Sequence, residues 1–170
     1  ALGDAREVPS LARLVHSLGE EGIRFQVIGM AGAILQGVPA TTLDTDLWID
    51  LPPRQYMRLI NLSMRLGARH ISNTVVELED GSLVNYVYEP NGLRSFSREY
   101  RSARSIRWLG HQVRVLPLER IRASKSAAGR PKDLAHLPLI DSVLRARRAV
   151  QPSRRPRPRS RPATRGPGLT

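Results

Sequence analysis

The sequence contains no cysteine, and this absence excludes disulfide frameworks, thiolate zinc sites and cysteine nucleophiles. Long hydrophobic runs are also missing, because no stretch approaches the roughly 20 apolar residues that a membrane-spanning helix needs. The first residues, Ala1 to Asp4, lack the basic start and the apolar stretch of a secretory signal. We therefore expect a soluble, cytoplasmic protein without a membrane partner.

Acidic residues are scarce relative to basic ones, with 15 Asp and Glu against 27 Lys and Arg and a formal net charge of +12. The imbalance is greatest in residues 151–170, which contain six Arg, five Pro and no acid. Such a segment cannot bury apolar surface, so we expect a disordered Arg/Pro-rich tail. The tail could hold RNA or DNA through phosphate contacts, or be a solvated or out-of-frame extension. Residues 1–150 form the expected folded domain, still basic and suited to an anionic ligand.

The spacing of apolar residues predicts, in order, a helix, a strand, a short helix, a strand and a helix, then antiparallel strands, and finally helices. Asp80-Gly81 and Gly110-His111 predict the turns of two hairpins. This mixture indicates an α+β fold, with a small mixed β-sheet flanked by helices and two helices at the C-terminal end. The expected helices are 10–20, 31–36, 52–66, 118–127 and 131–150, and the expected strands are 25–28, 47–49, 75–78, 83–87, 105–109 and 112–116.

Two acids separated by one residue, Asp44 and Asp46, stand where an apolar strand begins. In an extended chain they point to the same face, with Cα atoms roughly 6–7 Å apart. Like charges held this way are unfavourable unless a metal or a base compensates them. Mg²⁺ bound by carboxylates and substrate phosphates is the usual compensation in phosphoryl transfer. The pair therefore predicts a Mg²⁺ site, and a solvated pair at a strand edge is the alternative.

A glycine turn, Ile28-Gly29-Met30, precedes the acidic pair. A strand-to-helix turn with glycine exposes backbone N–H groups, which favour a phosphate. Each feature alone is common in proteins. Their order along the chain, a strand, a glycine turn, a small-residue helix and then an acidic pair entering a strand, favours a nucleotide site.

These motifs resemble the nucleotidyltransferase superfamily typified by DNA polymerase beta, and especially its small prokaryotic branch of minimal nucleotidyltransferases and abortive-infection nucleotidyltransferase toxins. The first family motif reads here as Ile28-Gly29-Met30 and, after thirteen residues, Asp44-Thr45-Asp46. Residues 36–42 match the stretch before the acids, and residues 124–134 match a late motif with a Lys and an Arg-x-Lys-Asp helix start. The resemblance spans residues 24 to about 148.

The resemblance implies a Mg²⁺-dependent enzyme that moves a nucleoside monophosphate from an NTP to RNA, such as tRNA, or to a protein hydroxyl. It also implies a setting in toxin–antitoxin pairs, with a partner protein. Asp44 and Asp46 would hold Mg²⁺ and, with Asn85, form the catalytic set. Lys125 could equally be an exposed helix lysine. The implied nucleotide-binding residues are Gly29, Met30, Thr42, Lys125, Arg130, Lys132 and Asp133, the last three also readable as first-turn charges of the final helix.

Three positions depart from the family pattern. Met30 stands where Gly or Ser is preferred, and we expect its bulk to hinder a triphosphate. Ala40 replaces an Arg, and Asn85 stands where the third carboxylate is expected. An amide binds a cation through its oxygen, but it is a poor base. Glu77 and Glu79 lie on the neighbouring predicted strand and are candidate substitutes for that base.

The sequence therefore supports three hypotheses about function. The first is an active nucleotidyltransferase. The second is a catalytically weakened member of the fold that acts as a binding or regulatory module, which Met30, Ala40 and Asn85 all favour. The third is a nucleic-acid-binding protein that works through its basic tail, although no aromatic residues interleave with the tail arginines to stack on bases.

Overall fold

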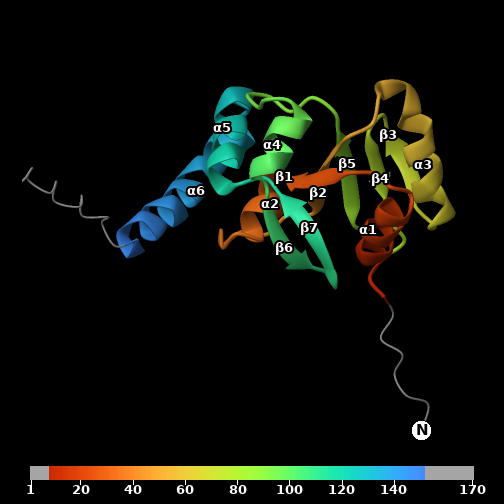
Figure 1. The fold of residues 1–170 in the computed structure, drawn as a ribbon, viewed down its shortest axis with the longest axis horizontal. Coiled ribbons are helices and arrows are strands. Elements are labelled where there is room, and N and C mark those ends of the chain that lie inside the picture. The colour runs from red at the N-terminus through yellow and green to blue at the C-terminus, as the bar shows by residue number, and fades with distance from the viewer. Residues whose placement is uncertain (1–7, 152–170) are drawn as a thin grey trace, which may run out of the picture.

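One mixed β-sheet with helices on both faces makes up residues 8–151, the range that a computed structural model of the chain describes (Figure 1). Within this range the sheet has seven strands in the order β3-β4-β5-β2-β1-β7-β6. The strands are β1 (Phe25–Ile28), β2 (Asp44–Ile49), β3 (Arg69–Ser72), β4 (Val75–Glu77), β5 (Leu83–Val87), β6 (Arg104–Trp108) and β7 (His111–Val115). The helices are α1 (Ser10–Glu20), α2 (Gly29–Ile34), a short 3₁₀ helix η1 (Pro53–Gln55), α3 (Tyr56–Arg65), α4 (Phe96–Ser102), α5 (Leu118–Ala128) and α6 (Pro131–Val150).

The two faces of the sheet carry separate hydrophobic cores. On one face, α1 and α3 pack on strand residues such as Val27, Leu47 and Val84. On the other face, α2, α4, α5 and α6 pack around Ile28 and Trp48. Alternation along β2 explains the division, because Leu47 and Trp48 point to opposite sides. Asp46 shares the face of Trp48, so it points toward the α5 and α6 layer.

The central strands place residues distant in sequence in one row across the sheet. β1 and β2 are antiparallel, with Ile28 opposite Asp46. β2 and β5 are parallel, with Asp46 opposite Asn85. β5 and β4 are antiparallel, with Asn85 opposite Val75. The row therefore runs from Gly29, which follows Ile28, through Asp46 and Asn85 to Val75.

The sequence prediction of an α+β fold with a mixed sheet and C-terminal helices is confirmed. Two elements were not predicted. β3 was missed because all four of its residues are exposed and show no alternation of polarity. α4 was also missed, although Ser95 caps it by accepting the backbone N–H of Arg98, an arrangement typical of helix starts.

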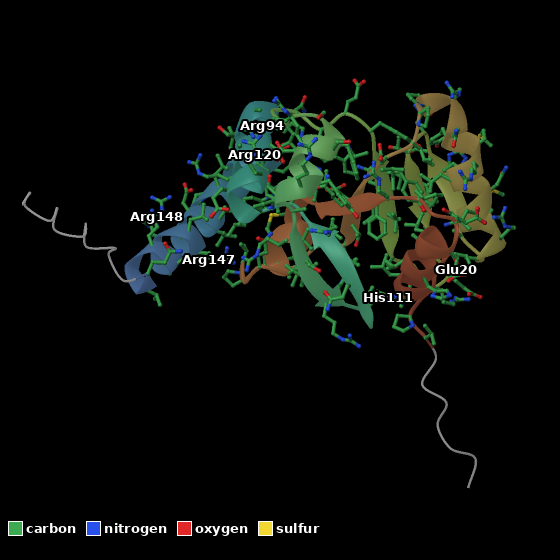
Figure 2. All side chains as sticks on the ribbon, viewed as in Figure 1. Glu20, Arg94, His111, Arg120, Arg147 and Arg148 are labelled. Atoms are coloured by element: carbon green, nitrogen blue, oxygen red, sulfur yellow. The ribbon has the colours of Figure 1, made fainter. Side chains whose placement is uncertain are left out.

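The two C-terminal helices, α5 and α6, pack against each other and meet at a corner around Gly129, and the C-terminal end of α6 extends away from the sheet (Figure 1). Gly129 ends α5 in the left-handed conformation, with φ of 61°, and Pro131 begins α6 at a position where its missing N–H costs nothing. Arg147 of α6 donates to the carbonyl of Gln36, and Gln36 itself bonds the backbone of Leu118 in α5. Figure 2 shows Arg147 and its neighbour on α6, Arg148, near the free end of the helix. These contacts fix the corner against α2.

No helix among residues 8–151 is long and apolar enough to cross a membrane. The predicted tail, residues 151–170, lies outside the described residues apart from Gln151.

Candidate functional site

The glycine turn and the second acid are in direct contact. Gly29 follows β1 with φ of 61°, a left-handed conformation that favours glycine. A Cβ placed on Gly29 would overlap Oδ2 of Asp46 and lie 3.1 Å from its Cγ. Only hydrogen fits between the turn and the carboxylate. The backbone of the turn is therefore held as close to Asp46 as the chain allows.

Asp46 is a half-buried carboxylate with one hydrogen bond. Burial raises its pKa above the ordinary value of 3.8, more strongly than the Asn85 hydrogen bond and the Lys125 charge lower it, and the charge of Asp44 raises it further. Neither Asp44 nor Asp46 forms an ion pair with any residue in the described range. Lys125 therefore acts on Asp46 from a distance and not through an ion pair.

The side chain of Asn85 is oriented by two partners. Its Nδ2 donates to Oδ1 of Asp46 over 2.9 Å, and its Oδ1 accepts from the hydroxyl of Thr74 over 2.8 Å. The amide therefore turns its donor toward the carboxylate and its oxygen away from it. In this orientation Asn85 neutralises no charge and presents no lone pair to a ligand of Asp46.

A charge cluster from α5 and α6 faces the same row. Asp133 is almost fully buried, with 1% of its side chain exposed. Its Oδ1 accepts from Nζ of Lys125 over 3.1 Å, and its Oδ2 accepts from Nε of Arg130 over 2.6 Å. Burial raises the pKa of Asp133, but the hydrogen bonds from Arg130 and Lys125 outweigh it and hold the pKa below the ordinary value. Asp133 thus fixes two cations close to Asp46.

Replacing Asp133 with Ala is expected to lower the free energy of unfolding by about 3 kcal/mol, because a buried Lys125 is left without its partner. Urea denaturation followed by circular dichroism measures the loss. Asp141→Ala is the matched control on the same helix, since it removes a carboxylate from an ion pair with Arg122 that solvent reaches, and its effect is expected to be smaller. Equal losses in the two variants would contradict the structural role given to Asp133.

The pH dependence of this contribution has a definite sign. The pKa of Asp133 is lower in the folded protein than in the unfolded chain, so the folded state binds its proton less tightly. The stability that Asp133 contributes is present in full above the unfolded pKa and is lost as the pH falls through the lower folded pKa. The denaturation midpoints of the native protein and the Asp133→Ala variant should therefore begin to converge as the pH falls below about 4.

Two cavities meet at Asp46. The first has a volume of about 240 Å³ and contains Gly29, Lys125 and Asp133 in its wall. The second has a volume of about 320 Å³; Val75 and Lys132 line it. Three residues line both cavities, and these are Asp46, Asn85 and Arg130. Asp46 and Asn85, the two strand residues of this shared wall, lie opposite each other on β2 and β5 in the middle of the row across the sheet.

The loop after β5 closes the first cavity on the side of α5. Gly92 packs so tightly that a Cβ there would lie 2.6 Å from Cβ of Ala127. Glu99 of α4, which is 2% exposed, accepts the backbone N–H of Arg94 in the loop and pairs with Arg120 of α5 over 2.7 Å. Figure 2 labels Arg94 and Arg120, which lie where the loop meets α5. The loop therefore packs on α5 at Gly92 and is hydrogen-bonded to Glu99, which is itself paired with Arg120 of α5.

No protein-family model and no curated protein sequence matches the chain. Solved structures match it over most of its length. The antibiotic-resistance factor ANT(2'')-Ia, determined in solution, has a TM-score of 0.54 at 16% sequence identity and covers 84% of this chain and 91% of that chain. The crystal structure of ANT(2'')-Ia in complex with adenylyl-2''-tobramycin has a TM-score of 0.55 at 17% identity, with 82% and 92% covered. An antigenic nucleotidyltransferase-like protein from Paracoccidioides brasiliensis has a TM-score of 0.54 at 19% identity, with 79% and 73% covered.

The chain has the nucleotidyltransferase fold. This confirms the fold expected from the two sequence motifs. Within that fold, the structure brings most of the predicted site residues to the two cavities. Those in the walls are Gly29, Asp44, Asp46, Asn85, Lys125, Arg130, Lys132 and Asp133.

Two predicted nucleotide-binding residues lie elsewhere in this nucleotidyltransferase fold. Met30 is 6% exposed and belongs to the hydrophobic core of the α5 and α6 face. We expected the bulk of Met30 to hinder a triphosphate. This expectation is wrong, because the side chain points into that core and not into the cavities. Thr42 is exposed, and its hydroxyl donates to the carbonyl and accepts the N–H of Asp44. Thr42 therefore shapes the backbone that carries Asp44.

The candidate replacement bases on β4 and in the hairpin turn are also displaced from the cavities. Glu77 pairs with Arg69 over 2.8 Å, and Glu79 pairs with Arg13 over 2.7 Å. Neither lines the two cavities. The first cavity instead contains Glu89, which was not predicted. Its spacing of four residues from Asn85 along an extended chain was the available signal, because such residues share a face.

The candidate ligands for a cation in this nucleotidyltransferase fold are the carboxylate oxygens of Asp44 and Asp46. Among residues 8–151, no group of three or more His, Cys, Asp and Glu residues could hold a metal ion. Asp44 and Asp46 offer two hard donors on one face, and Mg²⁺ is commonly bound by one or two carboxylates completed by substrate phosphates. No ion pair within residues 8–151 occupies these two carboxylates, so they are the candidate ligands for a cation.

Proposed function

We propose that the chain binds an NTP with Mg²⁺ and transfers the nucleoside monophosphate to a hydroxyl of RNA, such as tRNA, or of a protein. The contact between Gly29 and Asp46 carries this proposal. It makes a phosphate at the turn and a cation at Asp44 and Asp46 immediate neighbours. The nucleotidyltransferase fold of the chain supports the same class of reaction.

The residues of the first cavity suit the phosphates of the NTP. Gly29, which is half-buried and has no side chain, contributes only backbone to the wall of the cavity. Lys125 approaches from α5, held by Asp133, and Arg130 borders the same space. Positive groups fixed before the substrate arrives stabilise charge that builds up in phosphoryl transfer.

Asp44 and Asp46 would hold the Mg²⁺, which would offset the negative charge that builds up on the phosphates during transfer. Asp46 is positioned by Nδ2 of Asn85 and by the hydrogen-only contact with Gly29. The acceptor hydroxyl must lose a proton, and Asn85 cannot take it. In this proposal the proton passes to water, so the reaction is slow relative to one with a positioned base.

The orientation of Asn85 favours a second candidate function, that of a catalytically weakened binding or regulatory module. Its amide oxygen is occupied by the hydroxyl of Thr74, and its donor occupies Oδ1 of Asp46. Such a site still binds a nucleotide with its cation, while the third position contributes no charge and no base. In this case the function of the protein would be to bind the nucleotide, without transferring any part of it.

The setting of the activity rests on the sequence resemblance alone. We propose that the chain works in the cytoplasm as one component of a toxin–antitoxin pair, with a partner protein. Co-purification of the tagged chain with the product of a neighbouring gene tests this. A chain that purifies alone and leaves cell growth unchanged when it is overproduced would contradict the proposal.

Nucleotidyl transfer is tested directly with the purified protein, Mg²⁺ and each α-³²P-labelled NTP, together with total tRNA or whole-cell protein as acceptor. The double variant Asp44→Ala, Asp46→Ala is expected to lose all label transfer, because both proposed cation ligands are gone. The matched control is Asp50→Ala, which removes an acid at the end of the same strand from an ion pair with Arg24.

The outcomes separate the two candidate functions. Label transfer that survives the double substitution would show that Asp44 and Asp46 are not the active site. NTP binding without transfer to either acceptor would favour the weakened module. Loss of transfer in the double variant but not in Asp50→Ala would support the proposed enzyme.

A further inference from the structure

Residues 94–114 carry an excess of positive charge outside the two cavities. They contain six arginines and one acid, Glu99. The side chain of Glu99 is 2% exposed and pairs with Arg120, which lies outside this segment. None of the six arginines forms an ion pair with any residue between 8 and 151. The segment therefore carries arginine charges that no neighbouring carboxylate neutralises.

Two of these arginines lie on the outer side of α4. Phe96 and Glu99 are buried, so the side of the helix that carries them faces the protein. Arg98 and Arg101 each follow one of these residues by two positions, a rotation of about 200° around the helix, and both are exposed. Residues three apart on a helix are neighbours, so the two side chains project into solvent side by side.

Two more arginines lie on the face of the β6–β7 hairpin that α4 covers. Arg114 is on this face, because its guanidinium lies over the ring of Tyr100 in α4. Arg114 is opposite Ser105 of β6, and Arg107 follows Ser105 by two positions, so Arg107 shares the face. Arg104 is one position before Ser105 and points to the opposite face. The four arginines on the α4 side form one surface, which we call the basic surface: Arg98, Arg101, Arg107 and Arg114.

The guanidinium of Arg114 is fixed by two uncharged groups. It lies 5.1 Å from the centroid of the Tyr100 ring, and its Nη1 donates to the carbonyl of Ala103 over 3.4 Å. Arg24 also lies over Tyr100, but Asp50 pairs with it. Arg114 therefore keeps its charge and is ordered before a ligand arrives, which lowers the entropy that binding costs.

The chemistry of the basic surface favours a nucleic acid over a protein or a membrane. The planar fork of arginine matches a phosphate group. The large apolar side chains that are exposed in residues 8–151 all lie outside 94–116, whereas protein interfaces have an apolar core and membrane-surface helices insert apolar side chains. Nucleic-acid interfaces are polar and strongly positive. A phosphate backbone is therefore the partner that fits.

We propose that the basic surface binds the phosphate backbone of an RNA molecule. α4 is packed on the sheet through Phe96, so it is not free to enter a groove and read bases, and contacts to phosphates carry no sequence information. None of the four arginines lines either cavity. The surface therefore adds affinity for RNA and takes no part in the chemistry. The choice of RNA rather than DNA rests on the proposed function, which has RNA as an acceptor.

RNA binding is measured on the full chain by fluorescence anisotropy of a 5′-fluorescein RNA at several salt concentrations. Arg107→Glu is expected to weaken binding about tenfold and to reduce the salt slope by about one, because one phosphate contact is lost. Arg104→Glu is the matched control, since it makes the same charge change at an exposed residue of the same strand, but on the opposite face. Both variants keep residues 151–170, so the difference between them excludes a contribution from the arginines there.

The double variant Arg98→Gln, Arg101→Gln tests whether the basic surface extends over α4. Removing two exposed charges is expected to weaken RNA binding about tenfold and to reduce the salt slope by about two. Thermal denaturation followed by circular dichroism checks that the fold is kept. The affinity for an NTP with Mg²⁺ is expected to be unchanged in this variant and in Arg107→Glu, because neither alters a residue of the first cavity.

Four outcomes would overturn the inference. Equal RNA affinity of Arg107→Glu and Arg104→Glu would show that RNA binds through net charge or through another surface. Tighter binding of a DNA of the same sequence would identify DNA as the partner. Polyglutamate that binds as tightly as RNA would identify an acidic protein. Binding to phosphatidylserine vesicles that depends on Arg107, without RNA binding, would identify a membrane.

The basic surface and the proposed enzyme activity can fail separately. RNA binding that depends on Arg107, in a protein that transfers no nucleotide, would support the basic surface and contradict the enzyme activity. Transfer of label to RNA, with an RNA affinity that Arg107→Glu leaves unchanged, would support the enzyme activity and contradict the basic surface.

Discussion

Replacing Asn85 with Asp is expected to raise the rate of nucleotidyl transfer about 10²- to 10⁴-fold, which is the usual contribution of a positioned general base. Position 85 lies directly opposite Asp46 on the parallel strand, so the new carboxylate can accept the proton of a hydroxyl that attacks at Asp46. It also adds a third negative oxygen ligand for the cation. Single-turnover transfer of label from an α-³²P-NTP measures the rate.

The thermal stability of the Asn85→Asp variant should also show whether a cation binds at this position. Without Mg²⁺, the Asn85→Asp variant loses the hydrogen bond that Asn85 donates to Asp46 and gains a like charge in its place, at a cost of about 1–3 kcal/mol. Mg²⁺ should restore much of that loss. Thermal denaturation with and without Mg²⁺ therefore gives a test that does not depend on turnover.

Asn91→Asp is the matched control for this gain, because it adds the same charge to the wall of the first cavity but lies outside the row on the sheet. We expect no increase in transfer from it. An Asn85→Asp protein that binds Mg²⁺ and NTP yet transfers no faster than the native protein would show that position 85 is not the place of the base. Equal increases in the two variants would attribute the effect to charge alone.

Replacing Gly29 with Ala is expected to lower transfer at least about 100-fold, the effect of a displacement of about 1 Å in a catalytic group. The added methyl group would overlap Oδ2 of Asp46, so either the turn or the carboxylate must move. The left-handed backbone at Gly29 costs about 1 kcal/mol for Ala, and the overlap costs about 1–3 kcal/mol more. Urea denaturation and Mg²⁺ binding by calorimetry measure the two effects.

Gly22→Ala isolates the contact from the backbone strain. Gly22 has φ of 66°, close to the 61° of Gly29, but a Cβ there meets nothing within 4 Å. It should lose only the backbone contribution to stability and keep its Mg²⁺ affinity. Identical behaviour of the two variants would mean that the approach of Gly29 to Asp46 has no functional importance.

Local sequence patterns were sufficient for most of the fold. Apolar spacing and the turn at Asp80-Gly81 predicted the hairpin of β4 and β5, and the same spacing predicted helices at 118–127 and 131–150, where α5 and α6 lie. Each of these depends on interactions between residues close in the chain, which a sequence displays directly. The acidic pair on β2 followed from the same two-residue period.

The partners of the site residues were not visible in the sequence. Asp46 and Asn85 are 39 residues apart, and only the parallel pairing of β2 with β5 places them opposite each other. Thr74, which orients Asn85, belongs to no motif. Lys125 and Asp133 were both predicted to belong to a nucleotide site, but the ion pair between them was not predicted.

Local patterns in the sequence were enough to predict an α+β fold with two carboxylates on one face of a strand and a glycine turn before them. Three features became visible only in the tertiary structure. The turn at Gly29 contacts Asp46, Met30 points into the core, and Asn85 donates a hydrogen bond to Asp46. The physical reason is that periodicity and turn chemistry act between neighbours in the chain, while the surroundings of a charged group depend on strand register and helix packing. The same long-range packing places Lys132 at the second cavity.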